Sequence, residues 1–239
     1  MKHPIRAMLL AAGLGTRLRP ITLYTPKCLV PVAGEALLGR WLQQLESAGC
    51  EAVLINTHYL AAQVVDFLEK WHSTEMKIVL TYEPELLGTA GTLLANHSFF
   101  EGSTGLLIHA DNAMEGDLHG LINAHKNCSK QCLMTMLTFR TDRPKSCGIV
   151  QTDSDGIVTE FYEKVDNPPG DFANGALFVF DAPLIDHVLR MSPSPTDFSA
   201  EVIPSLLGKI QSWLTDKPYL DIGTPSSLAQ AQVLLSPIS

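Results

Sequence analysis

Positive charge is scarce in this sequence of 239 residues. It contains 17 lysines and arginines against 25 aspartates and glutamates, which gives a formal net charge of −8 at pH 7. A chain of this kind offers no basic surface that could neutralise a nucleic-acid backbone. We therefore expect no nucleic acid among its partners.

Long apolar runs are also missing. No run approaches the roughly 18 residues that a helix needs to cross a bilayer. The short apolar stretch after Arg6 ends at a glycine-rich turn, not at the small-residue cleavage site of a secretion signal. The sequence thus predicts a cytoplasmic protein with no membrane partner.

Cysteines are few and show no pairing pattern. The five are an odd number, lie scattered along the chain and form no CxxC pair, so neither a disulfide framework nor an ordinary zinc knuckle is indicated. His125, Cys128 and Cys132 could be imagined as metal ligands. Their spacing matches no familiar zinc pattern and no fourth ligand is apparent, so the sequence does not favour a metal there.

Apolar residues, by contrast, are abundant. Hydrophobic residues make up 46% of the chain, which is enough for one sizeable core and too much for a disordered protein or a coiled coil. The internal loops are too short to be interdomain linkers. We expect residues 1–239 to form a single domain.

The first half of the chain alternates between two kinds of apolar pattern. Continuous runs predict strands at 5–11, 52–55, 78–82 and 106–108, and helical spacing predicts helices at 37–48, 59–71 and 89–96. Strands that are apolar on both faces and separated by helices form a mostly parallel sheet covered on both sides. The pattern predicts an α/β protein with a three-layer α/β/α, Rossmann-like nucleotide-binding fold, in which ligands bind at the carboxyl ends of the strands.

The second half has a different character. The turn sequence at 153–156 (DSDG) separates apolar segments at 147–151 and 157–162, which predicts a β-hairpin. A further strand is predicted at 176–180 and a final apolar helical stretch at 228–235. We expect these strands to form a small antiparallel elaboration beside the main sheet.

The turn after the first strand reads Gly13-Leu14-Gly15 and could belong to a phosphate-binding loop. A dinucleotide-binding fingerprint fails, because Leu18 stands where that motif has Gly or Ala and Pro20 where its helix begins. A P-loop fails as well, because no GxxxxGK[ST] sequence occurs.

Three cations accompany this turn in an otherwise acidic chain. Arg17, Arg19 and Lys27 lie within eleven positions, and together with exposed backbone N–H groups they could bind an anion. The alternative is a tight turn with solvated basic residues.

The wider sequence around these residues strongly resembles the signature of the sugar-1-phosphate nucleotidylyltransferases. The resemblance rests on GLGTRLRP at 13–20 with PKCLVPV at 26–32, LGTAG at 87–91, Asp111, Glu163-Lys164, Asn174-Gly175 and LDIGTP at 220–225. These motifs stand in the family's order and span almost the whole chain. Within the family, the chain resembles mannose-1-phosphate or heptose-1-phosphate guanylyltransferases that lack a carboxyl-terminal β-helix.

This resemblance implies an enzyme that transfers a nucleoside monophosphate from a nucleoside triphosphate to a sugar 1-phosphate and releases pyrophosphate. The expected partners are these two substrates, the expected cofactor is Mg²⁺, and the expected state is a monomer or homodimer. The main task of such a protein is to bring two polyanions together and to stabilise spreading negative charge.

The resemblance also implies a role for individual residues. Arg17, Lys27 and Lys164 would be catalytic cations, and Asp111 and Asp221 would bind the metal. The nucleotide would contact Ala12, Gly13, Gly15, Thr16, Glu83, Gly88 and Thr89, and the sugar phosphate would contact Gly148, Glu163, Lys164 and Asn174.

Several of these residues have simpler interpretations. Each aspartate alone could be a cap or turn residue, and Glu163 with Lys164 could be a surface ion pair worth little. The family often has an aromatic residue where this chain has Cys147 and a proline where it has Val165, so the sugar is not readable.

The resemblance also implies that the residue at position 83 faces the edge of the nucleobase, so the base is partly readable from Glu83. Guanine presents two adjacent donors, N1–H and the N2 amino group, which a carboxylate accepts together, whereas uracil and thymine suit an amide such as glutamine. Glu83 therefore favours GTP over UTP or dTTP. The alternative is that Glu83 is a solvated residue before Pro84.

Two other classes of function stay open from the sequence. One is a catalytically inactive relative that binds a nucleotide sugar or a partner subunit, although the complete set of cations and aspartates argues against it. The other is a glycosyltransferase, which typically carries Asp-x-Asp. Here the segment reads Asp111-Asn112-Ala113, without the second aspartate.

Overall fold

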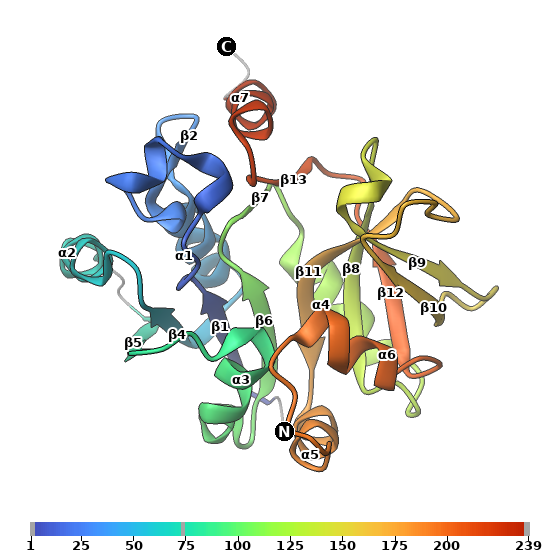
Figure 1. The fold of residues 1–239 in the computed structure, drawn as a ribbon. Helices are drawn as coiled ribbons and strands as arrows, with labels where there is room; N and C mark the ends of the chain where they lie inside the picture. Colours follow the sequence, from blue (N-terminus) through green and yellow to red (C-terminus); the bar gives the residue numbers. More distant parts are fainter. Residues whose placement is uncertain (1–2, 73–74, 237–239) are drawn as a thin grey trace. The chain divides into compact units, whose positions relative to one another are not determined.

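A computed structural model describes residues 3–72 and 75–236 of the chain (Figure 1). The chain divides into two compact units. The loop unit contains 5–86, 108–116 and the described residues from 217 onward, and the hairpin unit contains 3–4, 87–107 and 117–216. The chain therefore passes between the units several times.

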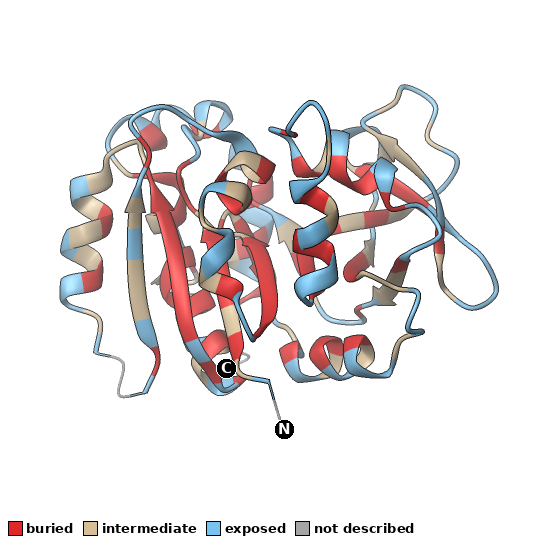
Figure 2. Cartoon of the chain, turned by 90° about the horizontal axis from the view of Figure 1, so that it is seen from below, coloured by how far each residue is buried: buried red, intermediate tan, exposed pale blue. Residues whose placement is uncertain are grey.

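Parallel strands form the centre of the loop unit. Strand β1 (Ile5–Leu10) pairs with β4 (Cys50–Thr57), and β4 pairs with β5 (Lys77–Tyr82), both in parallel register. β1 and β4 are almost entirely buried, as their apolar runs predict (Figure 2). β5 is an edge strand with exposed Leu80 and Tyr82, so the expectation of burial on both faces is wrong for this strand.

Helices of the loop unit follow the predicted segments with shifted ends. α1 (Leu37–Ser47) buries Leu38, Trp41, Leu42 and Leu45 at helical spacing and ends before Gly49, whose φ is +72°. Complete burial of each such side chain contributes about 1.5–3 kcal/mol. α2 (Ala61–Glu69) is shorter than the predicted 59–71 at both ends, and it starts later because Leu60 has a left-handed backbone.

Short elements complete the loop unit. β7 (Asn112–Met114) pairs antiparallel with β13 (Tyr219–Asp221), and β2 (Pro31–Val32) pairs with β3 (Glu35–Ala36). The last helix, α7 (Pro225–Leu234), begins with a capping box at Thr224 and Ser227. Strand β6 (Thr104–His109) begins in the hairpin unit and ends in the loop unit.

The hairpin unit is built on antiparallel strands. The predicted hairpin is confirmed as β9 (Gly148–Thr152) and β10 (Val158–Glu163), with the turn closed by the Asp153 carboxylate and by Gly156 at a φ of +78°. β11 (Phe172–Phe180) pairs antiparallel with β9 and β8 (Met134–Arg140), and β12 (Ile210–Leu214) pairs parallel with β8.

Helices α3 (Gly88–Ala95), α4 (Leu118–Asn127), α5 (Ala182–Leu189) and α6 (Ile203–Ser205) belong to the same unit. The antiparallel part is therefore larger than the small elaboration that the sequence predicts. The α/β class itself is confirmed, with mostly parallel central strands flanked by helices. Among the residues described, no helix combines the length and apolar character of a membrane span.

Candidate active site

The loop at residues 13–17 leaves the carboxyl end of β1. Gly15 has a φ of +61°, and a Cβ there would lie 2.8 Å from the Thr22 methyl carbon, so packing and backbone both require glycine. Gly13 is different, because a Cβ at Gly13 would meet no atom within 4 Å. The missing side chain at Gly13 thus leaves exposed backbone open to close approach by a ligand.

A buried core holds the loop and the Asp221 segment in place. Leu18 and Ile222 are fully buried and belong to one apolar cluster with Val30, Leu37 and Leu228 of α7. Leu18 follows the predicted site residue Arg17 in the sequence, and Ile222 follows Asp221. Burial of the apolar neighbour therefore positions the polar side chain beside it.

Lys27 is a buried cation between two carboxylates. Its side chain is only 7% exposed, and Nζ lies 2.5 Å from Asp111 Oδ2 and 3.6 Å from Asp221 Oδ1. The aspartates come together because Asp221 pairs with Asn112 in the β7–β13 ladder, and because Ile222 N donates to Asp111 O.

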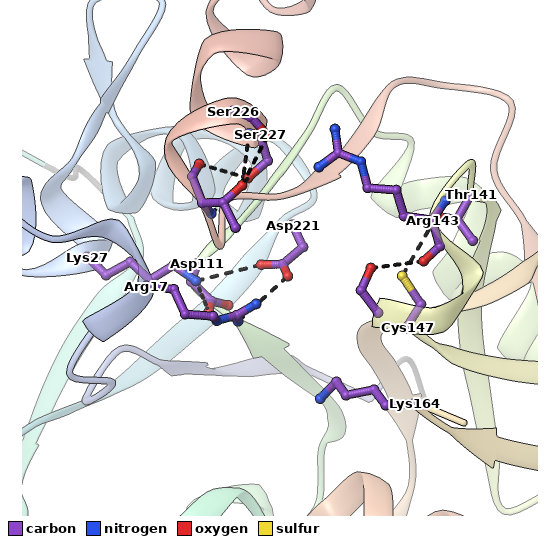
Figure 3. Close-up of polar contacts among 12 residues, drawn as sticks. Arg17, Lys27, Asp111, Thr141, Arg143, Cys147, Lys164, Asp221, Ser226 and Ser227 are labelled. Carbon is purple, nitrogen blue, oxygen red and sulfur yellow. Dashed lines mark hydrogen bonds and ion pairs between the residues drawn. The ribbon is translucent and has the colours of Figure 1, made fainter. Parts of the chain in front are cut away.

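Arg17 completes a group that we call the Lys27 cluster: Arg17, Lys27, Asp111 and Asp221. An Arg17 guanidinium nitrogen lies 4.0 Å from Asp221 Oδ2, and Figure 3 shows the four side chains turned toward one another. A Cβ at Gly223 would come within 2.9 Å of the same guanidinium. Gly223 thus leaves room for Arg17 beside Asp221.

The electrostatics keep Asp111 ionised. Burial raises the pKa of its carboxyl, but the charges of Lys27 and His109 and the hydrogen bond from Lys27 outweigh burial and lower the pKa below its ordinary value. Burial raises the pKa of the neighbouring Cys28 thiol to about 12, so this cysteine stays protonated and is no nucleophile.

The donor set of the cluster suits a hard divalent ion. Mg²⁺ is typically held by one or two carboxylates, with phosphate oxygens and water as the other ligands. Asp111 and Asp221 provide two such carboxylates. Within residues 3–72 and 75–236 there is no group of three or more His, Cys, Asp or Glu side chains that could hold a metal, and this includes His125, Cys128 and Cys132.

Glu83 lies at the carboxyl end of β5 and is buried, with 3% exposure. Its backbone N–H donates to Thr57 O, and its Oε1 accepts a hydrogen bond of 2.9 Å from Asn56 Nδ2. The alternative of a solvated residue before Pro84 is therefore wrong.

In the hairpin unit, Gly148 and Glu163 lie directly opposite each other in the β9–β10 ladder. A Cβ at Gly148 would lie 2.6 Å from Glu163 Oε2 and equally close to the Phe161 ring, so any larger residue would force these side chains to shift. Lys164 Nζ lies 2.8 Å from Glu163 Oε1, with the lysine side chain 62% exposed. The backbone of Lys164 is left-handed, with a φ of +50°.

Asn174 approaches the same strands from β11, because its neighbour Ala173 pairs with Ile149 of β9. Its Oδ1 accepts a hydrogen bond from Ala176 N at a bulge in β11. The structure thus brings together the predicted sugar-phosphate residues of β9, β10 and β11.

Gly88 and Thr89 begin α3, and hydrogen bonds connect the start of this helix to residues 196–198. Ala90 N donates to Thr196 O, and Phe198 N donates to Thr89 Oγ1 at 2.7 Å. A Cβ at Gly88 would overlap the Thr196 carbonyl. The hydroxyl of Thr89 therefore has a structural partner within the hairpin unit.

Residues 6–236 match the family described as nucleotidyl transferase. The chain belongs to the nucleotidyl transferase family. This confirms the resemblance to the sugar-1-phosphate nucleotidylyltransferases and speaks against the glycosyltransferase alternative. A mannose-1-phosphate guanylyltransferase from Mycobacterium tuberculosis is 30% identical over 234 residues, which cover 95% of this chain and 64% of the relative.

A mannose-1-phosphate guanylyltransferase catalytic subunit beta from Drosophila pseudoobscura pseudoobscura is 29% identical, over 96% of this chain and 62% of the relative. This nucleotidyl transferase chain thus spans less than two thirds of the length of these relatives.

Solved structures share the fold of this nucleotidyl transferase. A Bacillus anthracis protein described as a glucose-1-phosphate thymidylyltransferase superposes with a TM-score of 0.87 at 21% identity, over 98% of this chain and 96% of that one. HddC from Yersinia pseudotuberculosis, complexed with GMP-PN, superposes with a TM-score of 0.79 at 23% identity, over 95% and 98% of the two chains.

The predicted site residues of this nucleotidyl transferase fall into two sets. The loop unit contains Ala12, Gly13, Gly15, Thr16, Arg17, Lys27, Glu83, Asp111 and Asp221, and the hairpin unit contains Gly88, Thr89, Gly148, Glu163, Lys164 and Asn174.

Two supporting residues, Glu201 and Asn56, are not among the residues that the sequence predicts for the site. Glu201 accepts hydrogen bonds from Thr196 N and Asp197 N, and these bonds lower the pKa of its carboxyl. Asp197 caps this turn, because its side chain accepts a hydrogen bond from Ala200 N, three positions later. An aspartate at such a spacing is a signal that could have located the turn from the sequence. Asn56, the partner of Glu83, carried no such signal.

Proposed function

We propose that this chain transfers GMP from GTP to a sugar 1-phosphate and releases pyrophosphate. The observation that carries the proposal is the buried Lys27 shared by Asp111 and Asp221 next to the glycine loop. A buried cation with two carboxylates beside an open glycine backbone suits a triphosphate and its metal better than it suits an uncharged ligand. The names of the similar mannose-1-phosphate guanylyltransferases support the choice of substrates.

Repulsion between the two phosphate-bearing substrates is the first obstacle to this reaction. Arg17 and the backbone N–H groups of Gly13 to Thr16 would hold the triphosphate and stabilise the departing pyrophosphate. Lys27 would contact the nucleotide phosphates. Such charge contacts act most strongly where negative charge grows in the transition state.

The chemical step is an in-line displacement. An oxygen of the sugar phosphate forms a bond to the α-phosphorus of GTP as the bond to pyrophosphate breaks. No deprotonating base is needed, because a phosphate monoester is already anionic near neutral pH. Lys164 would hold the attacking phosphate, and Gly148, Glu163 and Asn174 would contact the sugar hydroxyls.

Asp111 and Asp221 would hold Mg²⁺. The ion, when bound, supplies positive charge that neutralises the reacting phosphates. Lys27 keeps the neighbouring Asp111 in the ionised form that a divalent cation requires. The charge of these carboxylates, more than their exact spacing, is the feature that supports the assignment.

Glu83 supports guanine as the base. The carboxylate is buried and held by Asn56, so it is ordered and shielded from bulk water. A carboxylate in such a site accepts both guanine donors and leaves one uracil or thymine carbonyl facing negative charge.

A substrate matrix tests the proposal. Four nucleoside triphosphates are combined with mannose, glucose and heptose 1-phosphates in the presence of Mg²⁺, and pyrophosphate release is followed. The expected result is the highest kcat/KM for GTP with one of the sugars. Preference for UTP or dTTP would replace the proposed base but keep the reaction class, and no release with any pair would contradict the reaction itself.

The location and assembly of the protein stay predictions. A cytoplasmic location follows only from the sequence pattern. Analytical ultracentrifugation would distinguish the expected monomer or homodimer from larger assemblies.

A further inference from the structure

Asn56 connects the segment that leads into the glycine loop with Glu83, two parts of the loop unit that lie far apart in the sequence. It is the residue before the end of β4 and is buried, with 3% exposure. Its Oδ1 accepts a 2.7 Å hydrogen bond from Ala11 N, between the end of β1 and the glycine loop. Its Nδ2 donates a 2.9 Å hydrogen bond to Glu83 Oε1.

The orientation of this amide is fixed by its neighbours. A backbone N–H can only donate, so Ala11 requires the amide oxygen on its side. The amide nitrogen must then face Glu83. A flipped amide would place two donors against each other and a carbonyl against a carboxylate, which costs free energy in a buried site.

Glu83 is held against Asn56 by its own backbone. Its N–H donates to Thr57 O at 2.9 Å, and its carbonyl lies 2.8 Å from His58 Nδ1. Three consecutive residues, 56 to 58, thus hold the backbone and the side chain of Glu83. The carboxylate has little freedom to rotate away from the Asn56 amide.

We infer that Asn56 is a positioning residue for base selection, because it decides which atom of the side chain at position 83 turns toward the Asn56 amide and which turns away. The inference rests on the proposed function, in which Glu83 contacts the nucleobase. It extends that proposal, because it assigns the selectivity to a pair of residues and not to position 83 alone.

The contact between Asn56 and residue 83 leads to a specific prediction for a glutamine at position 83. In Glu83→Gln, the Asn56 donor would attract the new amide oxygen, so the new amino group would turn away from Asn56 as a donor. In the double variant, which combines Asn56→Asp with Glu83→Gln, the carboxylate introduced at position 56 would accept from both Ala11 N and the amino group at position 83. The amide oxygen at position 83 would then turn away as an acceptor, as a carboxylate oxygen does in the unmodified chain.

The experiment compares the ratio of kcat/KM for GTP to that for UTP in the unmodified chain and in the two variants. A donor or acceptor left unpaired in a buried site disfavours the wrong base, so Glu83→Gln should lower the ratio by roughly 10- to 100-fold. The double variant should raise it again by about tenfold relative to Glu83→Gln. Calorimetric binding of the same nucleotides gives the ratio without relying on turnover.

A matched control is Asn96→Asp in the Glu83→Gln background. Asn96, the residue after the end of α3, also donates through Nδ2, but to the carbonyl of Thr92 within that helix. This control adds the same negative charge and should leave the ratio of Glu83→Gln unchanged. A merely structural role for Asn56 would not restore selectivity for one base.

The outcomes separate the two proposals. If the unmodified chain prefers GTP and the double variant keeps the ratio of Glu83→Gln, the inference is wrong and the proposed function stands. If the unmodified chain has no preference for GTP, the proposed base and the inference both fail. Thermal unfolding tests the same hydrogen bonds. The carboxylate at position 56 has a donor at position 83 only in the double variant, so the double variant should unfold at a higher temperature than Asn56→Asp alone. A double variant that is less stable than Asn56→Asp would overturn the inference.

Discussion

Lys27 donates a 2.5 Å hydrogen bond to Asp111, a residue 84 positions further along the chain. The lysine side chain is almost completely buried, and the aspartate is partly exposed. Burial of an ammonium group is costly unless an opposite charge and hydrogen bonds compensate for it. An apolar side chain would serve packing at lower cost, and this supports the proposal that Lys27 binds the nucleotide phosphates.

Arg17→Ala should leave the fold nearly intact, because the side chain is 64% exposed. Turnover should fall by two to three orders of magnitude, since a contact to developing charge is worth about 3–4 kcal/mol. Arg17→Lys should restore only part of this, because an ammonium cannot bridge two phosphate oxygens as a guanidinium does. Steady-state kinetics check the effect, and Arg190→Ala, at an exposed position, serves as the control. Unchanged turnover in a folded Arg17→Ala protein would exclude Arg17 from the reaction.

Asp111→Asn and Asp221→Asn should each reduce Mg²⁺-dependent turnover by about two orders of magnitude or more, because the ion supplies several kcal/mol of charge stabilisation. Binding of the sugar phosphate without nucleotide should change less. Kinetics over a magnesium titration check this, with the exposed Asp66→Asn of α2 as control. Full turnover of the unmodified chain in EDTA would contradict a role for the metal.

Gly148→Ala should disturb the residues that we propose contact the sugar phosphate. The added methyl would lie 2.6 Å from Glu163 Oε2 and the Phe161 ring, and such overpacking costs about 1–3 kcal/mol. We expect a lower melting temperature and a higher KM for the sugar phosphate. Gly170→Ala is the matched control, since a Cβ there meets nothing within 4 Å; equal effects of the two changes would argue against the role of Gly148.

Glu201→Gln should change how stability depends on pH. The backbone hydrogen bonds from Asp197 and Thr196 lower the pKa of Glu201 in the folded state. Its stabilising contribution is therefore present above the unfolded pKa of about 4.3 and is lost as pH falls through the lower folded value. Chemical denaturation should show a deficit for Glu201→Gln at pH 7 that shrinks toward pH 3, and a deficit independent of pH would contradict this.

The first half of the fold was predictable because its signals are local. The stripe of Leu38, Trp41, Leu42 and Leu45 is sufficient to place α1, and the apolar runs are sufficient to place β1, β4 and β6. The second half was harder. Strands β8 and β12 stabilise each other as a parallel pair across more than seventy residues, and β propensity depends strongly on such partners.

The candidate site shows the same division. The glycine loop, its cations and the two aspartates stand in recognisable motifs, so their residue types and order were readable from the sequence. The meeting of Asp111 with Asp221 depends on β7 and β13, which have three residues each and are too short for a periodic pattern. Asn56 was not readable at all, since a single asparagine in an apolar strand carries no motif.

The sequence by itself therefore determined the family, the α/β class and the chemical character of the residues that we propose bind phosphate and metal. Tertiary structure alone decided that Lys27 is buried between two carboxylates, that Gly148 faces Glu163 and that Asn56 joins Ala11 to Glu83. The physical reason is the range of the interactions. Hydrophobic periodicity and turn chemistry act over a few residues, whereas hydrogen bonds and ion pairs between distant segments exist only after the strands that carry them have paired.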